Sequence, residues 1–223
     1  MSPVPYKPGE SAQPGRQRLA VFDLDEVLID SRRAWQYAIE ESVAALCGRR
    51  IAAAALVSEY RRRPWAHALS ILVDEAELRA RAADLAQEMY ERSALKRLLV
   101  HEGIGMGLDR VRSHRIEVGA ITRLPHGFAL KQVQSTGLDR FITVLAATPD
   151  REPWAPHARI TQCRTFTEHN PNEVDYIADD PADLAQASTH GARPFFAAWT
   201  GVAVTPEMRR IATAQLITDE LLR

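Results

Sequence analysis

Short apolar runs alternate with amphipathic segments along the chain, and this alternation predicts the fold. Five runs have the length and composition of buried parallel strands, because they are mainly apolar and bounded by polar or turn-forming residues. The predicted strands are Leu19–Phe22, Ile116–Thr122, Phe141–Ala146, Val174–Ala178 and Pro194–Ala198. Helical segments lie between several of them, at Gly127–Ser135 and Ala182–Ser188. Strands that alternate with helices form βαβ units, so the sequence predicts an α/β fold on a parallel sheet.

A long helical block separates the first predicted strand from the second. Ser31 is a candidate N-cap for a helix that runs to Gly48, a residue typical of helix ends. Further helical segments follow at Ala52–Arg62, Trp65–Val73 and Glu75–Leu99, the last of them rich in good helix formers. Because no strand signal interrupts this block, residues 32–101 are predicted to form an inserted helical subdomain.

Two regions of the second half have less regular patterns. Pro149–Pro171 contains four prolines and a centre rich in β-branched and aromatic residues, which predicts a long loop that can include one extra short strand. Pro206–Leu222 is predicted to be the final helix, with Thr205 as its N-cap and Pro206 at its first position.

Composition and charge narrow the class of protein. With 223 residues, 46% hydrophobic content and a net charge of −1, the chain is typical of a globular protein with room for an inserted subdomain. The near-neutral charge gives no argument for nucleic acid or a membrane surface as a partner. Cys47 and Cys163 match no metal or redox spacing, which favours a reduced setting.

The N-terminal segment has the composition of a tail. Residues 1–17 are rich in proline and glycine and lack the apolar core of a signal peptide. No apolar stretch of the sequence is long enough to cross a bilayer. The sequence therefore predicts a flexible tail on a soluble, cytoplasmic protein.

Two aspartates follow directly after the first predicted strand. Asp23 and Asp25 belong to the segment Phe22–Ser31, which reads FDLDEVLIDS. Ligands of open α/β sheets bind at the carboxyl ends of strands. Two carboxylates at such an end repel each other and attract a divalent cation, which makes both candidate functional residues. The alternative is an acidic turn at the strand end with no catalytic role, and the structural context decides between the two interpretations.

The same segment resembles the first motif of the haloacid dehalogenase-like (HAD) phosphohydrolases, usually written hhhDxDG[TV]hhDS. The residues on matching positions are Asp23, Asp25, Val27, Asp30 and Ser31. Glu26 stands where the family has glycine. The resemblance spans about Leu19 to Val202 and is weakest between Pro149 and Asn172.

Two later strand ends resemble further motifs of that family. The strand ending in Thr122 is similar to the second motif, in which a hydroxyl and the following N–H bind a phosphoryl oxygen. Val174–Asp183 resembles the fourth motif, hhhhGDxxxD, with Ala178 where glycine is usual. In that motif Asp179 would bind a metal ion and Asp183 would support it. A helix N-cap and a first-turn carboxylate are the alternative for this acidic turn.

The resemblance implies an architecture and a mechanism. The Rossmann-like HAD core would comprise residues 18–31 and 102–223, with residues 32–101 as a helical cap. Asp23 would be the nucleophile that forms an aspartyl-phosphate, and Asp25 would be the general acid and base. The implied phosphate contacts are Thr122, Arg123 and Arg151.

The resemblance also implies a metal site. Its residues would be Asp23, Asp25, Asp179 and Asp183, with Asp25 contributing its carbonyl oxygen. Oxygen-only ligands favour Mg²⁺ over zinc or copper.

The lysine of the family's third motif is missing. Counted back from Pro171, its expected position falls near Trp154, and no lysine follows Lys131 in the sequence. Arg151 or Arg159 could supply the positive charge, although a guanidinium is larger and planar and does not simply replace an ammonium. Lys131 is a further candidate, with an ordinary solvated helix residue as the alternative.

Three functions stay open at this point. The first is a Mg²⁺-dependent phosphatase acting on a small phosphorylated metabolite. The second is a HAD-fold protein that binds a ligand without efficient turnover, favoured by the missing lysine and by Glu26, an extra anion beside the phosphate site. The third is a phosphomutase. Dehalogenase chemistry is disfavoured, because it does not need the second aspartate that Asp25 provides.

Overall fold

The computed structural model describes residues 18–53, 69, 72–148, 153–203 and 208–223, and it contains two compact units. One unit is formed by the chain up to Ile29 together with Val100–Arg223, and the other is Asp30–Leu99. Each of the two boundaries lies two residues before the boundary expected from the sequence. No helix in the described part of the chain has both the length and the apolar character that crossing a membrane requires.

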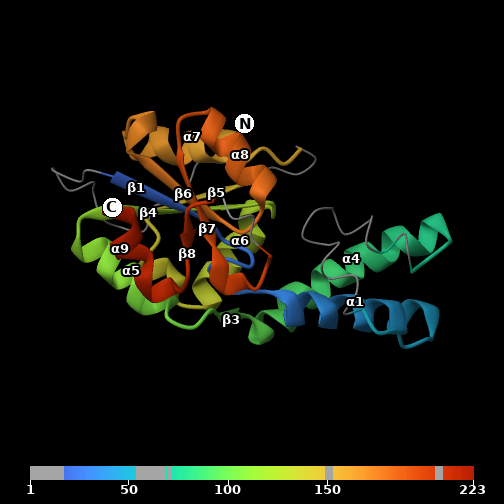
Figure 1. Cartoon of the computed structure of the whole chain (residues 1–223). Helices are drawn as coiled ribbons and strands as arrows, with labels where there is room; N and C mark the ends of the chain where they lie inside the picture. Colours follow the sequence, from blue (N-terminus) through green and yellow to red (C-terminus); the bar gives the residue numbers. More distant parts are fainter. Residues whose placement is uncertain (1–17, 54–68, 70–71, 149–152, 204–207) are drawn as a thin grey trace. The chain divides into compact units, whose positions relative to one another are not determined.

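A six-stranded parallel sheet forms the centre of the larger unit (Figure 1). In spatial order its strands are β5 (Val144–Ala147), β4 (Ile116–Thr122), β1 (Arg18–Asp23), β6 (Val174–Ala178), β7 (Arg193–Ala197) and β8 (Arg210–Ile211). In the register of this sheet Asp23 lies beside Ile121, and Phe22 lies beside Ile177. The carboxyl ends of β1, β4 and β6 therefore meet at one edge, which is where the sequence places its acidic residues.

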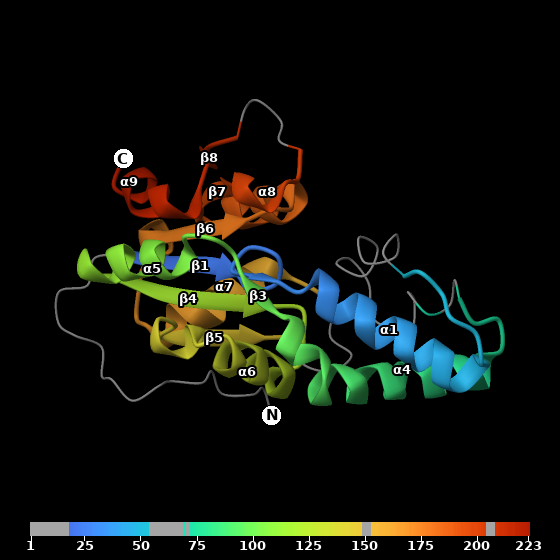
Figure 2. The same ribbon diagram turned by 90° about the horizontal axis from the view of Figure 1, so that it is seen from below.

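Helices cover both faces of the sheet, as the alternation of elements predicts (Figures 1 and 2). One face carries α7 (Pro156–Phe166) and α8 (Pro181–Thr189), and the other carries α5 (Ile104–Ser113), α6 (His126–Ser135) and α9 (Ile217–Leu221). Fully buried side chains such as Val21, Tyr176 and Phe196 fill the space under α7 and α8. Burial of this apolar surface is the main stabilising contribution, about 25 cal/mol per Å².

The smaller unit contains a pair of long helices. These are α1 (Arg32–Cys47) and α4 (Ala76–Arg92), and Trp35 of α1 stacks on Tyr90 of α4 with 4.0 Å between ring centroids. A short two-stranded sheet of β2 (Ile29–Asp30) and β3 (Leu99–Val100) joins the two ends of the insert. The expectation that residues 32–101 lack strands is therefore wrong at β3. Most of the predicted helices Ala52–Arg62 and Trp65–Val73 lies outside the described residues, and Ala52 and Ala53, which are described, are not helical.

Several predicted elements have their expected places. The strands β1, β4 and β6 are confirmed, and Gly48 ends α1 with a left-handed φ of 64°. Ser31 does precede α1, but its side chain makes no capping hydrogen bond. The carboxylate of Asp30 accepts the N–H of Arg32 at 3.1 Å instead.

The prediction of a loop over Pro149–Pro171 is wrong, because Pro156–Phe166 forms α7. Pro156 stands in the first turn, where a missing N–H costs no helical hydrogen bond. The helix buries Ile160 and Cys163 against the sheet. Tertiary burial thus outweighs the weak helix propensity of β-branched residues.

The predicted final helix is also mostly wrong. The described part of this segment forms β8, a 3₁₀ helix at Ala214–Leu216 and the five-residue α9. The N–H of Phe196 donates to the carbonyl of Arg209 at 2.8 Å, so this segment extends the sheet edge. Thr205 and Pro206 lie outside the described residues.

Two further boundaries differ, and one helix was not predicted. The strand expected at Phe141–Ala146 is Val144–Ala147, since the N–H groups of Phe141 and Ile142 donate to Leu138 in a turn. The helix expected to reach Leu99 ends at Arg92. No prediction covers α5, which contains two glycines and begins after Gly103 in a left-handed conformation.

Candidate active site

A tight turn directly after β1 presents both aspartates of the first motif. The N–H of Ile29 donates to the carbonyl of Leu24 at 3.1 Å, and the N–H of Glu26 donates to the carbonyl of Ile29 at 2.6 Å. Asp25 forms an isolated bridge with Ile29. The chain thus forms a closed loop directly after Asp23 and then continues in its original direction, which keeps both carboxylates at the edge of the sheet.

Glu26 occupies this turn in a conformation that favours glycine. Its φ is 69°, in the left-handed region, and its side chain is buried. A residue with a Cβ pays a steric cost of about 1 kcal/mol there, which explains physically why glycine suits this position. The indole N–H of Trp199 holds the next residue, since it donates to the carbonyl of Val27 at 2.9 Å.

Asp25 is held by two side-chain hydrogen bonds. The Thr122 hydroxyl donates to one carboxylate oxygen at 2.7 Å, and the Gln132 amide donates to the other at 3.1 Å. Burial raises the pKa of Asp25, the two hydrogen bonds lower it, and the negative charge of Glu26 raises it again. Asp25 therefore has a fixed orientation and holds its proton more tightly than an ordinary aspartate.

Asp23 is a buried carboxylate whose pKa is strongly raised. Only 7% of its surface is exposed, and burial raises its pKa well above the usual range. The negative charges of Asp179, Asp183 and Asp25 raise the pKa further, while the positive charge of Arg123 lowers it. The two acidic strand ends, distant in sequence, thus act on each other electrostatically.

Arg123 enters this acidic group from the end of β4. One of its terminal nitrogens donates to Oδ2 of Asp183 at 2.7 Å and lies 4.0 Å from Asp180. The indole N–H of Trp154 donates to the same oxygen of Asp183 at 2.9 Å. The guanidinium carbon also lies 4.6 Å from the centre of the Trp154 ring, in a cation–π contact. Arg123, Asp183 and Trp154 form a three-residue cluster, which we call the arginine clamp.

Tyr176 lies on β6 beside Val21 of β1, within the core under α7 and α8. Its side chain is fully buried, and its hydroxyl has no hydrogen-bond partner among the described residues. Burial raises its pKa well above the usual range, and the negative charges of Asp23 and Asp183 raise it further. Tyr176 is therefore a neutral phenol, close enough to Asp23 and Asp183 for their charges to act on it.

The predicted metal set is only partly assembled. Among the described residues, no three Asp, Glu, His or Cys side chains are grouped closely enough to hold a metal ion. The carboxylate of Asp25 already accepts two hydrogen bonds, and Oδ2 of Asp183 accepts two more. Asp23 and Asp179 are oxygen donors at the ends of two adjacent strands, β1 and β6. Mg²⁺ usually takes one or two protein carboxylates, so this pair of donors fits it.

The other residues that were candidates for replacing the charge of the missing lysine are Arg159, Lys131 and Arg151. Arg159 is buried and donates to the carbonyl of Ala147 at 3.2 Å and to Gln162 at 3.1 Å, contacts that join α7 to the end of β5. Lys131 is exposed on α6. Arg151 lies outside the described residues, so its predicted phosphate contact stays a prediction.

Sequence reasoning missed two residues that shape the site. Gln132 is a buried amide on α6, and no spacing in the sequence distinguishes it from a surface glutamine. Trp154 could have been suspected, because it stands near the expected position of the third-motif lysine.

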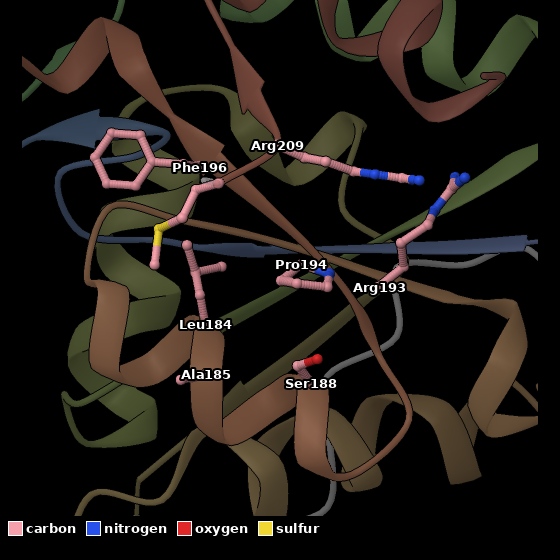
Figure 3. Close-up of a pocket in the computed structure, with 8 residues that line it drawn as sticks. Leu184, Ala185, Ser188, Arg193, Pro194, Phe196 and Arg209 are labelled. Atoms are coloured by element: carbon pink, nitrogen blue, oxygen red, sulfur yellow. The ribbon is translucent and has the colours of Figure 1, made fainter. Parts of the chain in front are cut away.

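A cavity of about 390 Å³ lies elsewhere on the same unit, between α8 and β7 (Figure 3). Leu184, Pro194 and Phe196 give it an apolar lining, and Arg193 and Arg209 stand at one side of it. The aspartates of the motifs do not line this cavity, so it is separate from the candidate active site.

The comparisons with known proteins agree with this geometry. A family model described as haloacid dehalogenase-like hydrolase matches residues 20–197. The chain belongs to the haloacid dehalogenase-like hydrolase family. No curated protein sequence matches this HAD-like hydrolase.

Solved structures with low sequence identity share its fold. A HAD-superfamily hydrolase of subfamily IA, variant 1, from Geobacter sulfurreducens has a TM-score of 0.76 at 16% identity, over 95% of this chain and 100% of that chain. A predicted phosphoglycolate phosphatase from Haemophilus somnus has a TM-score of 0.78 at 12% identity, over 93% and 99%. A candidate β-phosphoglucomutase from Thermotoga maritima has a TM-score of 0.70 at 18% identity, over 92% and 98%.

The raised pKa of Asp23 predicts how the stability of this HAD-like hydrolase depends on pH. The folded protein binds the Asp23 proton more tightly than the unfolded chain, whose aspartates have a pKa of about 3.9. This contribution to stability is complete below the unfolded pKa and is lost as pH rises through the folded pKa. The asparagine of an Asp23→Asn protein carries no charge at any pH, so it is not subject to this loss. We therefore expect the substitution to raise the free energy of unfolding near neutral pH by on the order of 1 kcal/mol.

Chemical denaturation in a chelating buffer measures this effect. The gain should shrink as the pH is lowered toward about 4, where the wild-type carboxyl is protonated as well. Asp109 is exposed and provides a matched control. The Asp109→Asn protein should have the stability of wild type both near neutral pH and near pH 4. An Asp23→Asn protein that is less stable than wild type near neutral pH would contradict the repulsion described above.

Glu26 offers a second test of the electrostatics. We expect both Glu26→Gln and Glu26→Gly to lower the pKa of Asp25, because each removes the negative charge that raises it. Carbon NMR of the Asp25 carboxyl group in the metal-free protein would follow the change. Glu26→Asp keeps the charge and should leave the pKa close to that of wild type. An Asp25 pKa that is equal in all four proteins would show that Glu26 exerts no field on it.

Proposed function

We propose that the chain is a Mg²⁺-dependent phosphohydrolase that acts on a small phosphorylated metabolite through an aspartyl-phosphate on Asp23. The observation that carries this proposal is the pair of carboxyls at the end of β1. Asp23 is buried among other acids, and Asp25, two residues on, is fixed by Thr122 and Gln132 and has a raised pKa. One strand end thus supplies both a nucleophile and an acid.

In the first step, a carboxylate oxygen of Asp23 attacks phosphorus in line with the leaving group. A bond forms between Asp23 and phosphorus, and the bond between phosphorus and the substrate oxygen breaks. Asp25 gives its proton to that leaving oxygen. Its raised pKa favours this role, because a general acid must still hold a proton near the working pH.

In the second step, Asp25 acts as a base. Its carboxylate takes a proton from a water molecule, and the water oxygen attacks phosphorus as the bond to Asp23 breaks. Inorganic phosphate leaves, and Asp23 returns as a carboxylate while Asp25 is protonated again. The hydrogen bonds from Thr122 and Gln132 keep Asp25 in one orientation through both steps.

Asp23, Asp179 and the carbonyl of Asp25 would hold the metal ion. When it is bound, Mg²⁺ screens the repulsion between carboxylate and phosphate. Asp183 was expected to support the ion, but its contacts with Arg123 and Trp154 favour a different role.

The role of the inserted unit and the class of reaction are proposed by analogy with the family. Asp30–Leu99 would serve as the cap that excludes water and selects the substrate. Structural relatives that carry phosphatase and phosphomutase names support phosphoryl transfer as the reaction class. A phosphomutase would use the same nucleophile and acid, and a catalytically impaired binding protein would keep the fold without turnover.

Phosphate release from an aryl phosphate and from a panel of metabolite phosphates tests the function. We expect turnover with Mg²⁺ and none in a chelating buffer. Asp23→Asn should reduce kcat at least about a thousandfold, because it removes the nucleophile. Asp25→Asn should cost about 10²- to 10⁴-fold, the usual contribution of a general acid and base.

Asp109→Asn is the control, and its kcat should equal that of wild type, since Asp109 is exposed on α5. Activity that survives Asp23→Asn would refute the assignment of the nucleophile. Wild-type protein that binds Mg²⁺ but releases phosphate from no substrate would favour the binding protein. Transfer of phosphate to a second position of the substrate would identify a phosphomutase.

A further inference from the structure

An aromatic residue, Trp154, lies near the place where the third-motif lysine is expected. It stands just before α7, which begins at Pro156. Its indole N–H points to Asp183, and its ring faces the guanidinium of Arg123. A positive group therefore does reach this part of the site, but it comes from the end of β4.

The arginine clamp fixes that positive group in three ways. Asp183 accepts a charge-assisted hydrogen bond from Arg123 at 2.7 Å, and the Asp183 side chain is only 10% exposed. Trp154 covers one face of the guanidinium and donates to the same Asp183 oxygen. Asp180, at 4.0 Å, adds a second negative charge. A guanidinium held in this way loses little further side-chain freedom when it binds a ligand.

We infer that Arg123, positioned by Asp183 and Trp154, takes over the work of the missing lysine and binds the phosphoryl group of the substrate. This inference rests on the proposed function. A guanidinium has five N–H donors, and the bond to Asp183 uses one of them. The others can meet phosphoryl oxygens, for which a planar fork of donors is well suited.

The inference gives Asp183 and Trp154 new roles. Asp183 serves as a positioning residue for an arginine, in place of the metal-supporting role that the fourth motif implies. Trp154 serves as a second positioning residue, because its ring and its N–H both contact members of the clamp. Arg123 also opposes the negative charge on Asp23, as the lysine would.

Binding of inorganic phosphate in the presence of Mg²⁺, measured by calorimetry, tests the inference without requiring turnover. We expect Arg123→Ala and Arg123→Gln each to weaken phosphate binding at least about tenfold, the usual effect of losing a charge-assisted contact. In the Arg123→Ala background, Trp154→Lys should recover a large part of the lost affinity, because it returns a cation to the family's position. If Arg123 had only a structural role, a lysine at position 154, on the other side of the guanidinium, would not be expected to restore phosphate binding.

Arg140 provides the matched control. Its guanidinium carbon also lies 4.6 Å from the centre of an aromatic ring, that of Phe141, so Arg140→Ala removes a cation–π contact of the same length outside the site. The phosphate affinity of the Arg140→Ala protein should stay within about twofold of that of wild type. Thermal melting of each variant would show that it is folded.

The possible outcomes separate this inference from the proposed function. Arg123→Ala and Arg123→Gln proteins that bind phosphate as tightly as wild type would overturn the role of Arg123 alone. A loss of affinity that Trp154→Lys does not reduce at all would overturn the exchange with the lysine. Wild-type protein that binds no phosphate would overturn both the inference and the proposed function.

Discussion

Repulsion between carboxylates, held in a region of low dielectric, is the constraint on which the site depends. Asp23 is buried at a strand end where three other aspartates raise its pKa, and Arg123 is the cation that opposes them. The fully buried Asp175 shows how the same fold treats a structural acid, since Arg18 and Arg193 both bind its carboxylate. Among the described residues, no pair of arginines binds the Asp23 carboxylate in this way. Its surroundings of like charge therefore favour the arrival of a cation and a phosphoryl group.

The parts of the site that lie on strand ends could be predicted from the sequence. Buried parallel strands are apolar runs of characteristic length, so the ends of β4 and β6 were located correctly and the end of β1 to within one residue. Parallel strands in one sheet present their carboxyl ends at one edge, which brings Asp23, Thr122 and Asp179 to the same region. The pattern of apolar residues therefore predicted the strands of the fold, and the resemblance to the family's motifs singled out Thr122 and Asp179 at the strand ends.

The contacts between these residues could not be predicted in the same way. Gln132 reaches Asp25 from a helix surface, and Trp154 reaches Asp183 from a segment interpreted as loop. Such contacts depend on packing angles that a single sequence does not encode locally. The helix α7 was missed for the same reason, because burial of its apolar side, not its propensity, stabilises it. Glu26 was recognised as unusual, but its left-handed φ became visible only in the turn itself.

The central claim is that a phosphoryl group passes through Asp23, and trapping the acyl-phosphate tests it most directly. Borohydride reduces an aspartyl-phosphate to homoserine, which changes the mass of the peptide that contains it. Quenching the reaction of the wild-type protein during turnover, followed by peptide mass mapping, should place this change at Asp23. A change at another residue, or rapid phosphate release with every peptide unmodified, would contradict the account.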